Sequence, residues 1–153
     1  MRKFITILSV MIITISMGVP AYADSYSRFS EDDEPNNTMN DAEYFKIDPE
    51  DDFIVINGIV SRDDEEDWFK VTSRKGSGES DIRLYSVDDD MNYSIYLYDE
   101  NGDCLASSSK SRRYTDTIKN IFIRKDKIYF IKVEYAGGGY PTMPYELFFG
   151  INQ

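Results

Sequence analysis

Short segments of alternating or continuous apolar residues, separated by polar turns, fill the chain from Phe53 to its end. Apolar residues at every second position are typical of strands with one buried face, whereas an amphipathic helix needs a period near 3.6 residues. We therefore expect almost no helix. The predicted strands are Phe53 to Val60, Asp67 to Thr72, Asp81 to Val87, Tyr93 to Asp99, Cys104 to Ser107, Thr117 to Ile123, Ile128 to Tyr135 and Tyr145 to Ile151.

The turns between these segments indicate how the strands are connected. Asn101-Gly102 is the strongest hairpin signal, because both central positions of the favoured two-residue turn need a positive φ. Many short strands with polar turns are typical of sandwiches. The sequence therefore predicts an all-β fold, an antiparallel two-sheet β-sandwich that is jelly-roll-like and has about eight strands.

The alternation also assigns faces within a strand. A period of two sends Tyr93, Ile95 and Leu97 to one side and Tyr96 and Tyr98 to the other. We expect the first set to face the core.

The N-terminus has the pattern of a secretory signal peptide. Arg2 and Lys3 precede an uncharged apolar run, residues 4–19, and Ala21-Tyr22-Ala23 forms a small-residue cleavage site. A membrane anchor is the alternative, but the run is short for a bilayer span and acidic residues follow it. We predict cleavage after Ala23 and a secreted, extracellular protein that has no membrane attachment afterwards.

The part beyond the signal peptide has the size of one domain, roughly 130 residues. Within it, residues 24–40 are polar and are predicted to form an acidic leader or linker. Residues 41–153 are predicted to form the β-sandwich domain.

Charge and composition exclude several classes of function. The net charge is −11 with 28 acidic residues, a balance that repels nucleic acid and attracts cations. The chain has no histidine, and so lacks the commonest general base and the usual zinc ligand. Cys104 is the only cysteine, so it forms no intrachain disulfide, and we expect it to be a small buried core residue.

These absences argue against an enzyme. We predict no catalytic residues, although Asp64 and Asp67 are a carboxylate pair of the kind that acts as acid and base in some hydrolases. Nothing else in the sequence indicates a substrate cleft.

Two segments are rich in oxygen ligands. Residues 31–38 read Glu-Asp-Asp-Glu-Pro-Asn-Asn-Thr, and residues 63–67 read Asp-Asp-Glu-Glu-Asp. Calcium takes six to eight oxygen ligands from carboxylates and amides, and two acidic segments brought together would repel unless a cation lay between them. The alternative is that both are solvated surface, as most charge runs are.

The chain also resembles a known family. The matching motifs, in order, are Glu34 to Thr38, Ile56 to Val60, Asp64 to Val71, Ser94 to Gly102 and Ile128 to Val133. Together they resemble the bacterial pre-peptidase C-terminal domain, a family that includes the collagen-binding domains of clostridial collagenases. The resemblance covers nearly the whole chain after the signal peptide.

The resemblance implies a jelly-roll-like sandwich with a calcium site that joins the leader to the loop before Trp68. Carried over by position, the metal ligands are Asp32, Glu34, Asn36, Asn37, Asp64 and Asp67. Asn37 stands where collagenase members often have a carboxylate, so the resemblance implies either a weaker site or one ion instead of two.

Tyrosines supply the candidate binding surface. Tyr96 and Tyr98 share one side of a strand, and Tyr135 and Tyr140 flank a triple glycine. The alternative is that they pack within the sandwich.

We interpret the protein as a secreted, non-catalytic, calcium-binding module that binds an extracellular protein or polysaccharide for adhesion or substrate targeting. The alternative is a regulator or folding helper of a separately encoded secreted peptidase, since members of the family usually accompany a peptidase.

Overall fold

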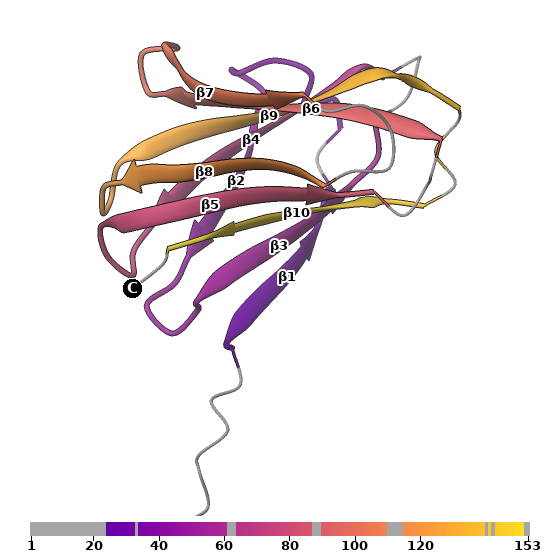
Figure 1. Cartoon of the computed structure of the whole chain (residues 1–153). Helices are drawn as coiled ribbons and strands as arrows, with labels where there is room; N and C mark the ends of the chain where they lie inside the picture. Colours follow the sequence, from indigo (N-terminus) through magenta and orange to yellow (C-terminus); the bar gives the residue numbers. More distant parts are fainter. Residues whose placement is uncertain are drawn as a thin grey trace, which may run out of the picture.

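The computed structural model describes residues 24–32, 34–60, 64–86, 90–109, 115–139, 141 and 143–151, and within these ranges it contains ten strands and no helix. Two five-stranded sheets pack face to face as a β-sandwich (Figure 1), which confirms the predicted fold class. The strands are β1 (Tyr26–Ser30), β2 (Glu43–Ile47), β3 (Phe53–Gly58), β4 (Glu66–Ser73), β5 (Gly78–Tyr85), β6 (Met91–Asp99), β7 (Cys104–Ser109), β8 (Asp116–Ile123), β9 (Ile128–Gly138) and β10 (Tyr145–Gly150).

The chain order within the sheets is that of a jelly roll. One sheet, called here the β10 sheet after its central strand, has the order β1-β3-β10-β5-β8, and the other, the β9 sheet, has the order β2-β4-β9-β6-β7. From β3 to β10 the chain changes sheet at every step except the β6–β7 hairpin. All strand pairs among β3 to β10 are antiparallel. These are the eight strands expected from the sequence.

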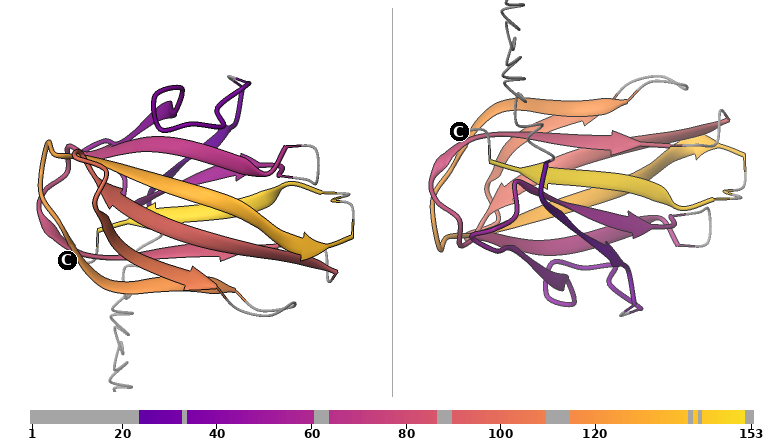
Figure 2. Two further views of the ribbon diagram at one scale, coloured as in Figure 1. Left: turned by 90° about the horizontal axis from the view of Figure 1, so that it is seen from above. Right: turned by 90° about the horizontal axis from the view of Figure 1, so that it is seen from below.

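The first two strands were not predicted. β1 pairs with β3 and β2 pairs with β4, and both pairs are parallel. Figure 2 shows both at the same side of the sandwich, each at the edge of its own sheet. The stretch expected to be a leader, residues 24–40, thus includes a strand of the β10 sheet and the crossover to the β9 sheet. The predicted signal peptide lies outside the described residues.

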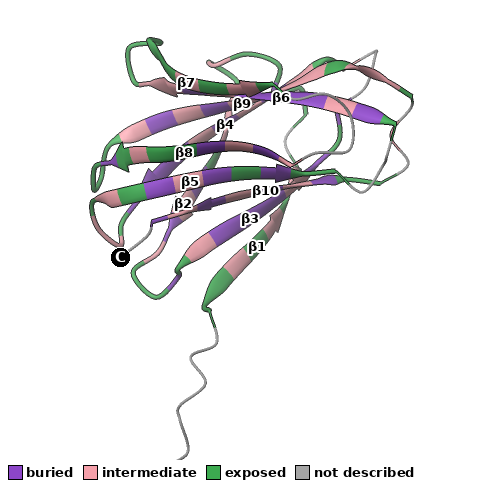
Figure 3. Cartoon of the chain, viewed as in Figure 1, coloured by how far each residue is buried: buried purple, intermediate pink, exposed green. Residues whose placement is uncertain are grey.

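Buried residues alternate with more exposed ones along most strands (Figure 3), and the buried apolar side chains form one core between the two sheets. Tyr93, Ile95 and Leu97 are buried there, as the alternation predicted. Among the described residues no helix has the length and apolar character needed to cross a bilayer.

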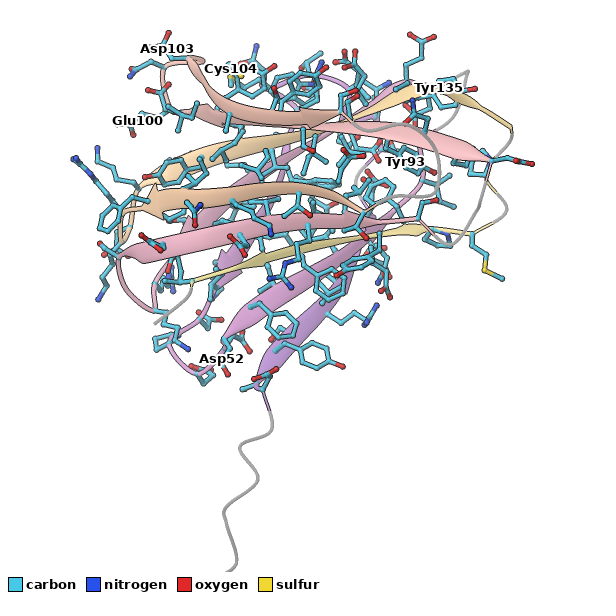
Figure 4. All side chains as sticks on the ribbon, viewed as in Figure 1. Asp52, Tyr93, Glu100, Asp103, Cys104 and Tyr135 are labelled. Atoms are coloured by element: carbon cyan, nitrogen blue, oxygen red, sulfur yellow. The ribbon has the colours of Figure 1, made fainter. Side chains whose placement is uncertain are left out.

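Cys104 is exposed, and the expectation that it belongs to the core was wrong. It begins β7, an edge strand, where a register shift pairs it with Tyr98. Paired residues on neighbouring strands point to the same side of a sheet, so Cys104 shares the outer face with Tyr98. In Figure 4, Cys104 lies at the start of β7, well away from the core residue Tyr93 of β6.

Candidate metal centre

The crossover from β1 to β2 is held against both sheets at one end of the sandwich. The Glu31 amide, directly after β1, donates to the Asn57 carbonyl at 2.9 Å, and so continues the pairing of β1 with β3. Five residues later the Asn36 carbonyl accepts a hydrogen bond from the Trp68 amide of β4 at 3.0 Å. These two backbone bonds bring the acidic residues of the crossover to the start of β4.

Three carboxylates meet at this point. One oxygen each of Glu31, Glu34 and Asp67 lies within 4.8 Å of the other two, and we call these three residues the acidic cluster. Two oxygens bound to one calcium ion at ~2.4 Å can be at most ~4.8 Å apart. The separation therefore suits a single shared cation.

Two fully buried side chains at the cluster each have one oxygen that accepts no hydrogen bond from the described residues. Asn36 donates from Nδ2 to Glu31 Oε1 at 2.5 Å, and Asp67 Oδ2 accepts from the Tyr145 hydroxyl at 2.5 Å. The remaining oxygens, Asn36 Oδ1 and Asp67 Oδ1, are buried without a hydrogen-bond partner among the described residues. A buried acceptor left unpaired costs about 1–3 kcal/mol, and a cation is a partner that removes this cost.

The electrostatics of the cluster favour a cation or a proton. Burial, followed by repulsion from Glu31, raises the pKa of Asp67 to about 9. Burial raises the pKa of Glu31 to about 7, and the charges of Glu34 and Asp64 add to the effect. Burial and the Asp64 charge also raise the pKa of Glu34. Without a cation the buried carboxyls therefore hold protons near neutral pH.

The donor set fits calcium. Every candidate ligand is a carboxylate or amide oxygen, which suits a hard cation rather than zinc or copper. A cavity of about 280 Å³, lined by residues that include Glu31, Glu34 and Gly58, gives access to the cluster. A side chain at Gly58 would collide with the Tyr145 phenol and lie 2.6 Å from Glu31 Oε2, so glycine leaves the room that the site needs.

Some of the predicted ligands lie at the cluster and others lie outside it. Glu34 and Asp67 belong to the cluster, and Asn36 donates a hydrogen bond to its third member, Glu31. The charge of Asp64 is close enough to raise the pKa of the three clustered carboxyls. Asp32 and Asn37 are exposed, and the Asp32 amide donates to Glu43 Oε2 at 3.3 Å. Their role as ligands stays a prediction.

Glu31 was not among the ligands predicted from the sequence. It is the first residue of the acidic segment and stands directly after a strand that was itself not predicted. A prediction of β1 as a strand would have identified Glu31 as a candidate ligand. The pairing of the end of β1 with β3 directs the Glu31 side chain towards β4.

An aromatic surface lies on the outer face of the β9 sheet, next to the metal centre. We call Trp68, Tyr96 and Tyr98 the aromatic face: the Trp68 and Tyr98 ring centres are 5.1 Å apart, and those of Tyr96 and Tyr98 are 6.4 Å apart. Lys132 Nζ lies over the Tyr96 ring at 4.6 Å and over the Trp68 ring at 5.8 Å. It also pairs with Glu66 at 3.1 Å, which fixes its position among the rings.

The predicted binding tyrosines fall in different places. Tyr96 and Tyr98 lie together on the aromatic face, each partly buried. Tyr135 is half-buried, packs against the core and donates from its hydroxyl to the Gly138 carbonyl at 3.0 Å. Tyr140 lies outside the described residues. Trp68 and Lys132 were not predicted as members of this surface, because their place beside Tyr96 depends on the pairing of β4, β9 and β6.

The sequence matches no protein-family model and no curated protein. Among the solved structures that are similar to the chain are two bacterial proteins. The pre-peptidase C-terminal domain of a collagenase from Bacillus anthracis has 16% sequence identity and a TM-score of 0.48, over 69% of this chain and 91% of that one. A β-glucosidase from Paenibacillus barengoltzii has 13% identity and a TM-score of 0.34, over 83% of this chain but 13% of that one.

Proposed function

We propose that this protein is a secreted, non-catalytic module that binds calcium at the acidic cluster and an extracellular protein at the aromatic face. One observation carries the proposal: Asp67 and Trp68 are consecutive residues of β4 with opposite orientations. Asp67 points inwards to the cluster with 0% exposure, and Trp68 points outwards to Tyr98. A cation held by Asp67 therefore fixes the strand from which the binding surface is built.

Calcium acts in this proposal as a clamp on the crossover. Glu31, Glu34 and Asn36 come from the segment after β1, whereas Asp67 belongs to β4. The ion supplies the positive charge that lets these side chains be ionised together at neutral pH. An ion that binds only the folded chain stabilises it by mass action.

The proposal that the module is non-catalytic rests on the hydrogen bonds that the buried carboxylates accept. Asp67 Oδ2 is bound by Tyr145, and Glu31 is bound by Asn36 and by the Ile59 amide at 3.2 Å. The chain has no histidine to act beside them. These contacts orient the oxygens towards one another rather than towards a substrate.

The chemistry of the aromatic face favours a protein ligand. Tryptophan and tyrosine give large contact areas at low entropic cost and are enriched among the residues that dominate protein–protein binding. Lys132, at the centre of the aromatic face, and Glu66, at its rim, form a charged pair. Such a surface suits an extended partner with mixed polar and apolar side chains. The resemblance noted from the sequence makes fibrillar collagen the first ligand to test.

The test is retention of the purified protein on immobilised collagen fibrils in calcium and in EGTA. Binding should occur in calcium, and Tyr96→Ala should weaken it by about tenfold or more, the scale of a dominant interface residue. Phe122→Ala is the matched control, since Phe122 is an aromatic side chain with 61% exposure on the other sheet. No retention, or equal loss in both variants, would overturn this ligand assignment.

A pull-down from culture supernatant addresses the alternative role. Capture of a secreted peptidase by the wild-type protein and equally by Tyr96→Ala would favour a regulator of that peptidase. Capture of matrix protein that the substitution abolishes supports the binding module.

A further inference from the structure

A second aromatic surface lies on the opposite side of the molecule, on the outer face of the β10 sheet. Four rings form a continuous row across β1, β3, β10 and β5. Tyr26 stacks on Phe53 with ring centres 5.0 Å apart, Phe53 is 5.9 Å from Phe148, and Phe148 is 5.1 Å from Tyr85. The two end members, Tyr26 and Tyr85, are 50% and 39% exposed.

The row faces outwards and is separate from the core. Val55 shares this side, because it pairs with Arg28 on β1 and with Phe148 on β10. It is fully buried but does not belong to the core cluster, which contains its neighbours Ile54 and Ile56. The β10 sheet thus has an ordered apolar layer on its outer side as well as its inner side.

Part of this layer is hollowed into a groove along the end of β10. The groove has a volume of about 410 Å³; Phe148 and Gly150 line it on β10, between Phe53 on β3 and Tyr85 and Arg83 on β5. A side-chain carbon at Gly150 would lie 2.7 Å from the Phe53 Cβ and 2.9 Å from the Asp52 carbonyl. Only glycine fits at this point, and its lack of a side chain keeps that end of the groove open.

Polar groups surround the aromatic floor, and most of their charges are already compensated. Arg83 Nη2 pairs with Asp81 Oδ2 at 3.1 Å, and Lys75 Nζ pairs with Asp52 Oδ1 at 2.5 Å. Asp52 Oδ2 also accepts the Ser25 amide at 3.0 Å. Figure 4 shows Asp52 at this outer side of the sandwich, in the turn before β3. The rim therefore offers fixed hydrogen-bonding groups rather than a strong field of one sign.

We propose that this groove binds a neutral oligosaccharide. A sugar ring has an apolar face of C–H groups and an edge of hydroxyls, which match an aromatic floor and a rim of fixed carboxylate and guanidinium groups. A cavity of this size that combines aromatic side chains with oriented polar groups is typical of small-ligand sites. A charged ligand would have to compete with the Arg83–Asp81 and Lys75–Asp52 pairs, whereas hydroxyls can bind beside them.

This site is independent of the metal centre and of the aromatic face. No residue of the groove belongs to the β9 sheet or to the acidic cluster. Failure of either proposal therefore leaves the other standing.

The test is isothermal titration of the purified protein with four neutral hexasaccharides, built from β-1,4-linked glucose, xylose, mannose and N-acetylglucosamine. At least one should bind in calcium and equally in EGTA. Tyr85→Ala and Arg83→Gln should each weaken binding by about tenfold, the loss of one stacking or one charge-assisted contact. Phe122→Ala, on the same sheet but outside the groove, should leave the affinity unchanged.

The variants are compared only where their melting temperatures match the wild type, and both altered side chains are exposed, so folding should be preserved. Absence of binding to all four hexasaccharides at millimolar concentration overturns the proposal. So does binding that survives both groove substitutions, or tighter binding of an arginine hexapeptide than of any sugar, which would indicate a cationic peptide site.

Discussion

At the scale of single residues, the proposed metal centre depends on a carboxylate buried where its charge is costly. Asp67 has no exposed surface, one oxygen bound by Tyr145 and one oxygen without a hydrogen-bond partner among the described residues. Burial of a carboxylate is tolerated when a cation or a proton compensates it. Removing the charge of Asp67 should therefore have opposite effects on the stability of the protein in the absence and in the presence of calcium.

The substitution Asp67→Asn tests this. The amide keeps the shape and an oxygen for Tyr145 but removes the charge, so in EGTA the variant should melt at or above the wild-type temperature. Calcium at 100 times its Kd should stabilise the wild type by about 2.7 kcal/mol, or about 10 °C, and the variant by much less. Differential scanning calorimetry measures both. Glu100→Gln, which alters an exposed carboxylate outside the cluster, should keep the full calcium shift.

The raised pKa values of the cluster also predict how stability depends on pH. Glu31 has a pKa of about 7 and Asp67 of about 9, both above the value near 4 of an unfolded chain. The folded state then binds more protons than the unfolded one, so this contribution is full below about pH 4 and is lost as the pH rises towards 7 and 9. Calcium displaces these protons, so its affinity should increase over the same range.

Melting in EGTA and in calcium between pH 5 and pH 9 checks this. The melting temperature in EGTA should fall with pH relative to that in calcium, so the gap between the two curves should widen. A gap that narrows or stays constant would show that no protons are released from the cluster.

At the scale of elements, the sequence was informative for β3 to β10, including the edge strands β7 and β8, and uninformative for β1 and β2. The strands β3 to β10 were predicted because their apolar residues alternate or run continuously. β1, with the sequence Tyr-Ser-Arg-Phe-Ser, has only partial burial on its inner side, and β2 is five residues long. Their pairing is set by contacts with β3 and β4, which a local pattern does not encode.

The same limit explains the partial prediction of the site. Composition showed two acidic segments and predicted a cation between them, and three of the predicted ligands, Glu34, Asn36 and Asp67, lie in or beside the acidic cluster. Glu31 was missed, because only the parallel pairing of β1 with β3 shows that it faces Asp67. The exposure of Asp32 and Asn37 likewise follows from the path of the crossover between β1 and β2, which the sequence pattern does not give.

β1 should therefore link stability to metal binding. Phe29 is its inward anchor, with its ring centre 5.1 Å from that of Phe45, and Glu31 follows two residues later. Phe29→Ala should cost about 2–4 kcal/mol, somewhat less than a fully buried phenylalanine, and should also weaken calcium binding. Urea unfolding in EGTA and calcium titration measure the two effects.

Arg28→Gln is the control on the same strand. Arg28 is exposed and pairs with Glu146, an interaction worth about 0–1 kcal/mol at a surface. Calcium affinity unchanged in Phe29→Ala would show that β1 does not position Glu31.

At the scale of the whole molecule, the crossover is the only described segment that carries ligands from one sheet edge to the other sheet. β1 and β2 are edge strands of different sheets, and each pairs with one neighbour, β3 or β4. Edge elements with few partners open locally at lower free energy than central strands such as β9 and β10. The proposed ion lies where the two edges meet, so its stabilisation should be unevenly distributed over the fold.

Amide hydrogen exchange in EGTA and in calcium reveals that distribution. Removing calcium should increase exchange most in β1, in β2 and at the Trp68 amide, which donates to Asn36 in the crossover. Protection there should fall by up to about 100-fold, the factor that corresponds to 2.7 kcal/mol, and should stay below that of the central strands β5 and β10, which open mainly by global unfolding. Equal protection of β1, β2 and the central strands in EGTA would mean that the crossover does not open separately, and no loss of protection in β1 and β2 on removing calcium would mean that the ion does not join the two edges. Greater exchange at Trp68 than at β5 would connect the metal centre to the aromatic face through a measured opening of β4.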